Sequence, residues 1–462
     1  MMKTYAMSAA DAAWFHIDGP ANLAITMGVV LTRKPLDFDR VRKLYSERIT
    51  SFDRFRQRVV ETGFPMATPH WQDVPHFDID QHLHHIALPA PHDEAALMRL
   101  VSDIAGMPLD HALPLWQAHV VDDVEGGSAL ITRCHHCMAD GTAMMTVIQR
   151  LFDPAPGAKP LPPPRARGAS IGAGAGDRLF APAIDLITEL ARDATALAAG
   201  AGMLVTELLR ADDPPSPLKG DFALGKRVAW SKPFPLGDIK AIGRRYDAKV
   251  NDVLVAVVTG ALRTYLKGRG VDVDHTTLRA MVPVDLRPPE RIGQLGNEFG
   301  LVLLDLAVTR ARADHRLALT KARMDELKRS PEPLATKALL SLLGRGPKLL
   351  EDFSNDLFGR KASMVLTNVA GPQEVLHIAG VPIERILAWA PHPGRQLGMT
   401  ASIFTYRELA SLTVIGDARL IPDPEAITSE FNREFQKLLR SATAGAARNT
   451  AREPQARKLP SA

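Results

Sequence analysis

Apolar and polar positions in the first third of the chain switch between strand-like and helical spacing. A run of β-branched and apolar residues predicts a strand, whereas apolar residues recurring every three or four positions predict a helix. Ser8 and Asp11 have the spacing of a capping box, which is typical of a helix start. The predicted elements are a helix after Ser8, a strand over 24–31, a helix over 38–49, a hairpin of strands 118–124 and 129–134, and a helix over 144–152.

The pattern changes twice along the rest of the chain. A segment rich in proline and glycine follows Pro154 and predicts an extended linker, which leads into a mildly amphipathic helix over Phe180–Leu209. The second half predicts a buried helix over 252–266, strands over 299–308, 363–367, 400–406 and 409–415, and a last helix opened by Asp423-Pro424. We therefore expect an α/β (α+β) protein with a first domain at 1–153, a linker with a crossing helix at 154–225, a second domain at 226–442 and a disordered tail at 443–462.

Composition narrows the class of protein. Hydrophobic residues make up 46% and charged residues 23% of the 462, which is a globular balance. Two cysteines exclude a disulfide scaffold and fit a reducing compartment. The formal net charge of +4 is too small to indicate nucleic-acid binding, but it is compatible with an anionic substrate or membrane surface. No secretory or membrane-spanning segment is evident, so we expect a cytoplasmic protein whose contact with a membrane is peripheral.

The strongest candidate for chemistry is the segment Cys134-His135-His136-Cys137-Met138-Ala139-Asp140-Gly141. Zinc ligation is one interpretation, but consecutive side chains at a strand end point to opposite faces and do not converge on one ion. A redox pair of Cys134 and Cys137 is another, although such pairs belong at a helix N-terminus. The alternative for both cysteines is that they are small buried apolar residues.

The third interpretation is an HHxxxDG catalytic corner between a strand and a helix. His136 would emerge from the strand end into a cavity, where an imidazole with a pKa near the working pH takes a proton from a hydroxyl. His135 would face the other way and support the structure. Asp140 would lock the loop by capping the helix or by an ion pair, and Gly141 would permit a tight backbone. Two hydrogen-bonded structural histidines remain the alternative.

At this motif the sequence resembles the chloramphenicol-acetyltransferase-like superfamily of CoA-dependent acyltransferases, and within it the bacterial wax ester synthase/diacylglycerol acyltransferase family. The resemblance runs from Met7 to about Leu439. It is carried by the opening Met7-Ser8-Ala9-Ala10-Asp11 with Trp14-Phe15, by Pro114-Leu115-Trp116, Asn251-Asp252-Val253, Pro283-Val284-Asp285-Leu286-Arg287, Gly296-Asn297-Glu298-Phe299 and Thr367-Asn368-Val369-Ala370-Gly371-Pro372.

The resemblance implies two chloramphenicol-acetyltransferase-like domains that form a tunnel, with acyl-CoA entering from one side and a lipid alcohol from the other. His136 would be the general base, no acyl-enzyme would form, and no cofactor would be bound, with acyl-CoA as co-substrate. The implied activity is transfer of a long-chain acyl group to diacylglycerol, a fatty alcohol or both. Substrate-binding candidates are Asn251, Asp252, Arg287 and Asn297.

These secondary motifs also have structural interpretations. Asn251 and Asp252 precede an apolar helix, where both are ordinary N-caps; alternatively, Asn251 donates a hydrogen bond near the reacting centre. Arg287 either pairs with Asp140 across the domain interface or lies on the surface. Pro114-Leu115-Trp116 is interpreted as packing before a strand. The histidine-rich stretch His82, His84, His85 and His92 is expected in a solvated loop.

Three functions therefore compete. The first is an acyl-CoA-dependent O-acyltransferase in peripheral contact with the inner membrane or lipid inclusions, with no nucleic-acid partner. The second is a related acyltransferase that esterifies a polyketide or peptide product from a carrier protein. The third is a non-catalytic protein of the same fold that binds a lipid surface; the intact HHxxxDG motif argues against it.

Overall fold

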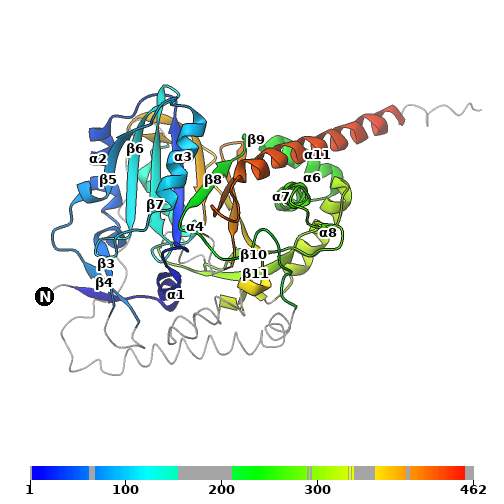
Figure 1. Ribbon diagram of the computed structural model, residues 1–462. Coiled ribbons are helices and arrows are strands. Elements are labelled where there is room, and N and C mark those ends of the chain that lie inside the picture. Colours follow the sequence, from blue (N-terminus) through cyan, green and yellow to red (C-terminus); the bar gives the residue numbers. More distant parts are fainter. Residues whose placement is uncertain are drawn as a thin grey trace, which may run out of the picture.

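The computed structural model describes residues 3–61, 68–154, 211–288, 291, 294–330, 332–334, 336–337, 359–391 and 396–452. Within them the chain forms two large sheets that lie next to each other, each with its own helices (Figure 1). The expected mixed α/β architecture with two halves is therefore confirmed. Most of the predicted linker, including the helix expected over Phe180–Leu209, lies outside the described residues.

The first large sheet belongs mainly to the N-terminal half and has six strands in the order β13-β14-β2-β7-β6-β5. Its central hairpin, β6 with β7, is the predicted one, and Glu125 and Gly126 turn the chain with positive φ values of 49° and 82°. The strands are β2 (Ile25–Thr32), β5 (Leu83–Ala87), β6 (Trp116–Val124), β7 (Gly127–His135), β13 (His377–Ile378) and β14 (Val381–Trp389).

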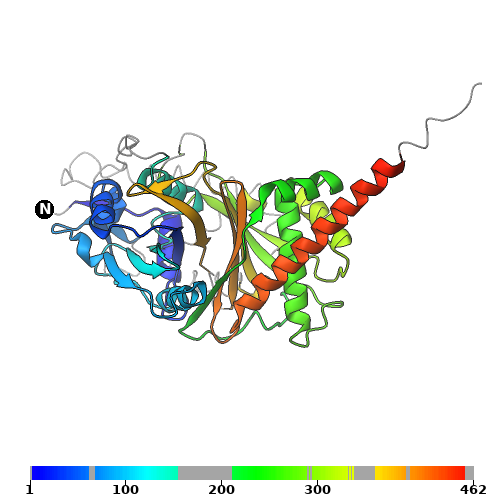
Figure 2. The ribbon, with the colours of Figure 1, turned by 90° about the horizontal axis from the view of Figure 1, so that it is seen from above.

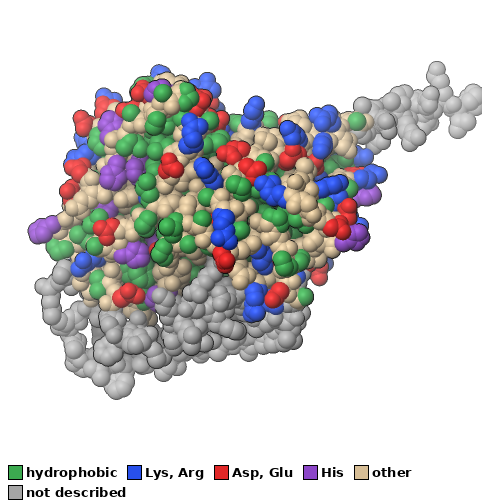
Figure 3. Space-filling model, viewed as in Figure 1, with side chains coloured by type: hydrophobic (Ala, Val, Ile, Leu, Met, Phe, Trp, Pro, Cys, Tyr) green, Lys and Arg blue, Asp and Glu red, His purple; other side chains and the backbone are tan. Residues whose placement is uncertain are grey.

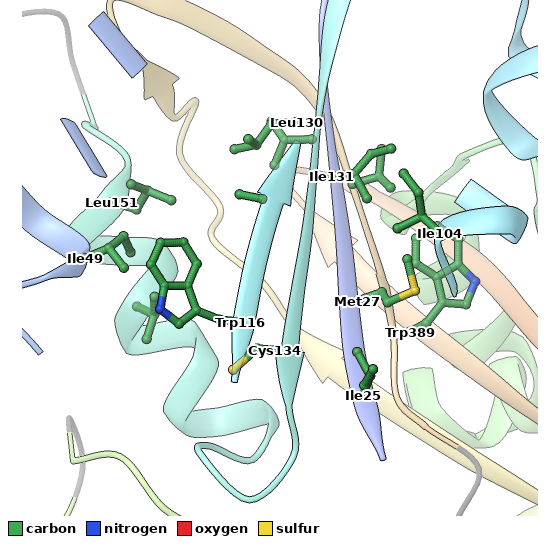
Figure 4. Packing of buried hydrophobic residues seen from close by; sticks show 14 of the residues in the cluster. Ile25, Met27, Ile49, Ile104, Trp116, Leu130, Ile131, Cys134, Leu151 and Trp389 are labelled. Atoms are coloured by element: carbon green, nitrogen blue, oxygen red, sulfur yellow. The ribbon is translucent and has the colours of Figure 1, made fainter. Parts of the chain in front are cut away.

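This sheet is buried on both faces. Figure 4 shows Trp116, Ile49 and Leu151 on one side of β7, and Met27 and Trp389 on the other. Nearly every residue of β7 is buried, as expected of a central strand covered on both faces. The strand that ends at the HHxxxDG motif is thus one of the most firmly embedded in the protein.

The second large sheet has seven strands, in the order β11-β10-β12-β15-β16-β8 with β9 also paired to β16. Figure 2 shows its helices on one face, with α11 lying across α7. The strands are β8 (Lys226–Trp230), β9 (Phe234–Pro235), β10 (Arg279–Asp285), β11 (Phe299–Asp305), β12 (Met364–Ala370), β15 (Met399–Tyr406) and β16 (Leu409–Asp417). The helices are α6 (Leu236–Tyr246), α7 (Val250–Lys267), α8 (Ala313–Leu327) and α11 (Pro424–Arg452).

Smaller elements complete the N-terminal half. A three-stranded sheet in the order β1-β4-β3 lies beside α1. The elements are β1 (Thr4–Ala6), β3 (Gln57–Val60), β4 (His70–Asp73), α1 (Ala9–Ile17), α2 (Phe38–Leu44), α3 (Glu94–Ala105), α4 (Gly141–Leu151), a π-helix (Tyr45–Ile49) and two 3₁₀ turns (Asp53–Arg56, Ile79–Gln81). Ser8 caps α1 as predicted, because its Oγ accepts from the Asp11 N–H at 3.2 Å.

Two predicted boundaries are wrong. β14 comes from the second half of the sequence, yet it pairs antiparallel with β2 and extends the first sheet, so 226–442 is not one spatial unit. The tail predicted to be disordered from Thr443 is helical as far as Arg452, because α11 continues past that point. Strand exchange between sheets depends on long-range pairing and leaves no local sequence signal.

The histidine-rich stretch differs from expectation except at His92, which is exposed and lies outside the helices and strands as predicted. His82 is 1% exposed, its ring is stacked on that of Trp116, and its Nδ1 lies 2.8 Å from the Trp116 carbonyl. His84 and His85 lie in β5 rather than in a solvated loop. The expected packing role of Leu115 and Trp116 is confirmed, since both are buried and Trp116 begins β6.

The surface and the helices agree with the composition. Acidic and basic side chains are interspersed on the face that Figure 3 shows, without a large field of one sign. In the described part of the chain, none of the helices combines the length and apolar character that crossing a bilayer requires.

Candidate active site

The HHxxxDG motif forms the strand–loop–helix corner that the sequence predicts. β7 ends at His135, a short turn follows, and α4 begins at Gly141. Asp140 is the N-cap of α4, because its Oδ1 accepts from the Ala143 N–H at 2.8 Å. The predicted need for glycine at position 141 is not supported, because a Cβ there would meet Val369 Cγ2 at 3.4 Å, which is an ordinary van der Waals contact.

His136 lies at this corner with its imidazole enclosed by aromatic rings. Its N–H donates to the Ala24 carbonyl at 2.7 Å. Its ring is stacked on the indole of Trp14, with centroids 3.9 Å apart and planes 18° apart, and meets Phe299 edge-on at 6.0 Å. The ring Nδ1 is buried and has no hydrogen-bond partner in the described structure.

The environment of His136 sets its charge. The residue is 7% exposed, and burial lowers the pKa of the imidazole from 6.5 to about 3. The expectation of a pKa near the working pH is therefore wrong, because an enclosed aromatic site disfavours the imidazolium. The ring is neutral at physiological pH, which is the form that can accept a proton.

His135 faces away from His136 and is held by polar groups. Its Nδ1 accepts from the Cys137 N–H at 3.2 Å, which assigns the ring proton to Nε2. Nε2 lies 3.7 Å from Asp18 Oδ1, and His111 approaches Asp18 Oδ2 at 3.3 Å. Burial alone would raise the pKa of Asp18, but the two histidines lower it. This geometry supports the predicted structural role of His135.

Asp140 and Arg287 form a buried ion pair between the two halves. Arg287 Nη2 lies 2.7 Å from Asp140 Oδ2, and the two side chains are only 1% and 8% exposed. Arg287 also donates to the carbonyls of Gly296 at 2.8 Å and Gln294 at 3.0 Å. The predicted pairing is thus confirmed. The alternative positions of Arg287, at the surface or bound to substrate, do not fit a guanidinium that the protein itself surrounds.

Asn297 is buried beside the same corner. Its Nδ2 donates to the His136 carbonyl at 2.8 Å and to Asp11 Oδ1 at 2.8 Å, and its main-chain N–H donates to the same Asp11 oxygen at 3.0 Å. Asn297 Oδ1 has no partner within the described residues. The sequence singled out Asn297 as a substrate-binding residue, but its amide donors are used to hold His136.

Asn251 and Asp252 lie in the first turn of α7 rather than before it. The N-cap is Lys249, so the prediction that Asn251 caps the helix is wrong. Asp252 is fully buried and accepts from the Lys249 N–H at 2.8 Å, which is a capping-box contact. Asn251 is exposed and accepts a hydrogen bond from Asn368 of β12, so two of the sequence motifs meet.

The two cysteines are free, buried thiols. Burial raises the pKa of Cys134 to about 12 and that of Cys137 well above its ordinary value, so neither is a ready nucleophile. Cys134 Sγ lies 3.6 Å from Met138 Sδ in the core. Across the described residues, no cluster of three or more His, Cys, Asp or Glu side chains is arranged to hold a metal ion.

Asp11 and Trp14 are the site residues whose roles the sequence analysis missed. Both belong to α1 and reach the corner from one face of that helix. Two signals were available: both residues belong to the opening motif that carries the family resemblance, and a spacing of three residues brings side chains to the same helix face.

Comparisons with known proteins identify the family of the chain. The wax ester synthase/diacylglycerol acyltransferase catalytic domain matches residues 7–254, and the C-terminal domain of the same family matches residues 295–439. A Mycobacterium tuberculosis protein named as a diacylglycerol O-acyltransferase is 26% identical over 416 residues, covering 88% of this chain and 89% of its own. A Mycobacterium bovis protein with the same activity in its name is 27% identical, covering 95% and 92%.

Solved structures share the fold. The wax ester synthase/diacylglycerol acyltransferase of Marinobacter aquaeolei superposes with a TM-score of 0.69 at 22% identity, covering 95% of this chain and all of the other. The first condensation domain of the calcium-dependent antibiotic synthetase superposes with a TM-score of 0.61 at 18% identity, covering 95% and 96%. The family match spans more than half of the chain and includes the corner with His136. The chain therefore belongs to the wax ester synthase/diacylglycerol acyltransferase family and is an acyltransferase.

Proposed function

We propose that this protein transfers a long-chain acyl group from acyl-CoA to the hydroxyl of a lipid acceptor, either diacylglycerol or a fatty alcohol. The observation that carries the proposal is the position of His136 at the HHxxxDG corner, where Trp14 and Phe299 enclose its imidazole and the ring Nδ1 makes no hydrogen bond within the described residues. The family to which the chain belongs and the names of its relatives support the choice of acyl donor and acceptor. The reaction requires no bound cofactor, and acyl-CoA is a co-substrate.

The proposed reaction uses one proton carrier. His136 takes the proton from the acceptor hydroxyl as the oxygen attacks the thioester carbonyl. The carbonyl π bond opens to a tetrahedral oxyanion, which collapses by breaking the carbon–sulfur bond. His136 returns its proton to the CoA thiolate, so the base is regenerated. No acyl-enzyme forms, and the buried thiols of Cys134 and Cys137 take no part.

The acceptor and the place of action follow from the same proposal. A lipid alcohol partitions into membranes and lipid inclusions, so the enzyme meets it by peripheral contact with the inner membrane or a lipid inclusion from the cytoplasm. A carrier-protein donor is the competing proposal, since condensation domains share the fold. Nucleic acid has no part in either reaction.

The test is release of CoA by the purified full chain from palmitoyl-CoA, with diacylglycerol, hexadecanol and no acceptor as parallel arms. Acceptor-dependent release is the expected result, and His136→Ala should lower it by about 10²–10⁴-fold, the usual contribution of a positioned general base. His119→Ala is the matched control, because His119 lies on β6 in the same sheet and is also shifted to lower pKa by burial.

Two outcomes would overturn the proposal. Full activity in a folded His136→Ala enzyme would remove this residue from the mechanism. Acyl transfer from a carrier-protein thioester, with none from palmitoyl-CoA on any acceptor, would assign the protein to the competing reaction.

A further inference from the structure

The N-terminal helix α1 contributes two side chains to the surroundings of His136. Asp11 is buried with 2% exposure, and its Oδ1 accepts both the N–H and the Nδ2 donor of Asn297, at 3.0 and 2.8 Å. Trp14, one turn later, is stacked on the imidazole. The helix thereby touches the catalytic candidate directly through one residue and indirectly through another.

Asn297 is the link between Asp11 and His136. Its Nδ2 donates to the His136 carbonyl at 2.8 Å as well as to Asp11. Because Asn297 belongs to the second half of the chain, the Asp11–Asn297 contact joins segments 286 positions apart in sequence. Without the Asp11 carboxylate, two buried donors of Asn297 would lose their acceptor, and the amide would be free to turn away from His136.

The His136 ring has few other restraints. In catalytic triads, a carboxylate hydrogen-bonded to the imidazole fixes the ring, but here Nδ1 has no hydrogen-bond partner among the described residues. Orientation then comes from the main chain, from ring packing and from the Asn297 side chain, whose interaction with the imidazole opposes the effect of burial on its pKa. The main chain is held by the Ala24 carbonyl at 2.7 Å and by Asn297, and the ring by Trp14 and Phe299.

We propose that Asp11 is a positioning residue for acyl transfer, which through Asn297 fixes the main chain at His136 and through α1 keeps Trp14 stacked on the imidazole. The inference rests on the proposed function, because it assigns His136 the role of base. Arg54, 4.0 Å from Asp11 Oδ2, supplies a cation beside the buried carboxylate. Asp11 does not touch the reacting atoms, so its removal should lower kcat more than it alters KM.

Two near-isosteric substitutions separate hydrogen bonding from packing. Asp11→Asn keeps an oxygen acceptor for Asn297, and its kcat should stay within about threefold of wild type. Asp11→Leu fills the same space without an acceptor, and its kcat should fall by about 10- to 100-fold, the scale of a displaced catalytic group. Asp93→Leu is the matched control, because Asp93 likewise accepts a hydrogen bond from a main-chain N–H. Its Oδ1 accepts from Ala96 at 2.7 Å at the start of α3. The kcat of this variant should not change.

The double variant Asp11→Leu/Asn297→Leu tests whether Asp11 acts on His136 through Asn297. If Asp11 acts through Asn297, the double variant should be no slower than the slower single variant. The proposal would be overturned if the fold decreases in kcat of the two single variants multiply in the double variant. It would also be overturned if kcat of Asp11→Leu stays within twofold of wild type. Equal kcat in the Asn and Leu variants would also overturn it, because the hydrogen-bond acceptor would then be irrelevant.

A readout without turnover keeps this inference distinct from the proposed function. The rate at which diethyl pyrocarbonate modifies His136, measured by peptide mass spectrometry, should rise in Asp11→Leu and not in Asp11→Asn. Failure of the wild-type protein to release CoA would contradict the proposed function alone. An unchanged modification rate in Asp11→Leu would contradict the positioning role even if the enzyme is active.

Discussion

The buried ion pair between Asp140 and Arg287 gives the most direct test of how the corner is held. Arg287→Met removes the guanidinium but keeps most of the apolar stem. It would leave the Asp140 carboxylate buried, with only the main-chain N–H groups of Ala143 and Glu298 as donors, at 2.8 and 2.9 Å. The Gln294 carbonyl would also lose the Arg287 donor, and the Gly296 carbonyl would keep only the longer hydrogen bond from the Asp140 N–H, at 3.4 Å.

The magnitude follows from burial. The two side chains are 1% and 8% exposed, so solvent cannot replace the lost partner. Removing one member of such a pair typically costs about 3–5 kcal/mol. For a cooperative unit of about 150–250 residues, each kcal/mol lowers the melting temperature by roughly 2–4 °C. We therefore expect Arg287→Met to lower the apparent melting temperature by about 6–20 °C.

The assay is thermal unfolding by circular dichroism, combined with a double-mutant cycle. Asp140→Asn removes the charge but retains an N-cap of equal quality, so the cycle with Arg287→Met isolates the pair. Arg33→Met is the control, because Arg33 and Glu384 also join the two halves but are 80% and 44% exposed. That pair should contribute less than about 1 kcal/mol. Equal melting shifts for Arg287→Met and Arg33→Met would refute the reasoning.

Other predictions concern acid stability and the thiols. Burial lowers the pKa values of His136 and His119 from 6.5 to about 3 and about 4, so the stability that these neutral rings contribute is present above about pH 6.5 and is lost as the pH falls toward 4. In urea unfolding, His119→Gln should reduce the loss between about pH 7 and 5 by on the order of 1 kcal/mol, and an unchanged loss would contradict this. Replacing Cys134 and Cys137 together by alanine should leave kcat unchanged, and a drop that exceeds the fraction of protein unfolded would implicate a thiol.

Local signals predicted the corner correctly. The strand before His135, the Asp140 cap and the helix that follows depend on residues adjacent in sequence, where propensity and capping rules operate. The Arg287 pairing with Asp140 was predicted only as one of two alternatives, and the structure shows the buried ion pair rather than a surface arginine. The start of the last helix at Pro424 was likewise encoded locally.

Long-range contacts escaped prediction for a physical reason. The pairing of β14 with β2, the burial of His82 against Trp116 and the reach of Asp11 to Asn297 each join segments whose proximity is decided by the tertiary fold. The low pKa of His136 was not predicted for the same reason, because the aromatic rings that enclose its imidazole come from α1 and β11. Patterning indicates that a position is buried but not what it is buried against.

The contacts that the second half makes at the corner come from one segment, which follows β10 and leads into β11. Gly296 runs alongside Ala139 with a φ of 107°, a conformation that favours glycine, and its carbonyl accepts from Arg287. The next residues hold the His136 carbonyl and the Asp140 carboxylate, and Phe299 meets the His136 ring. The HHxxxDG motif lies in the first half of the sequence, yet this segment of the second half forms much of its surroundings. The corner is therefore a product of both halves: Ala24 and Trp14 hold His136 from the first half, and Asn297 and Phe299 hold it from the second.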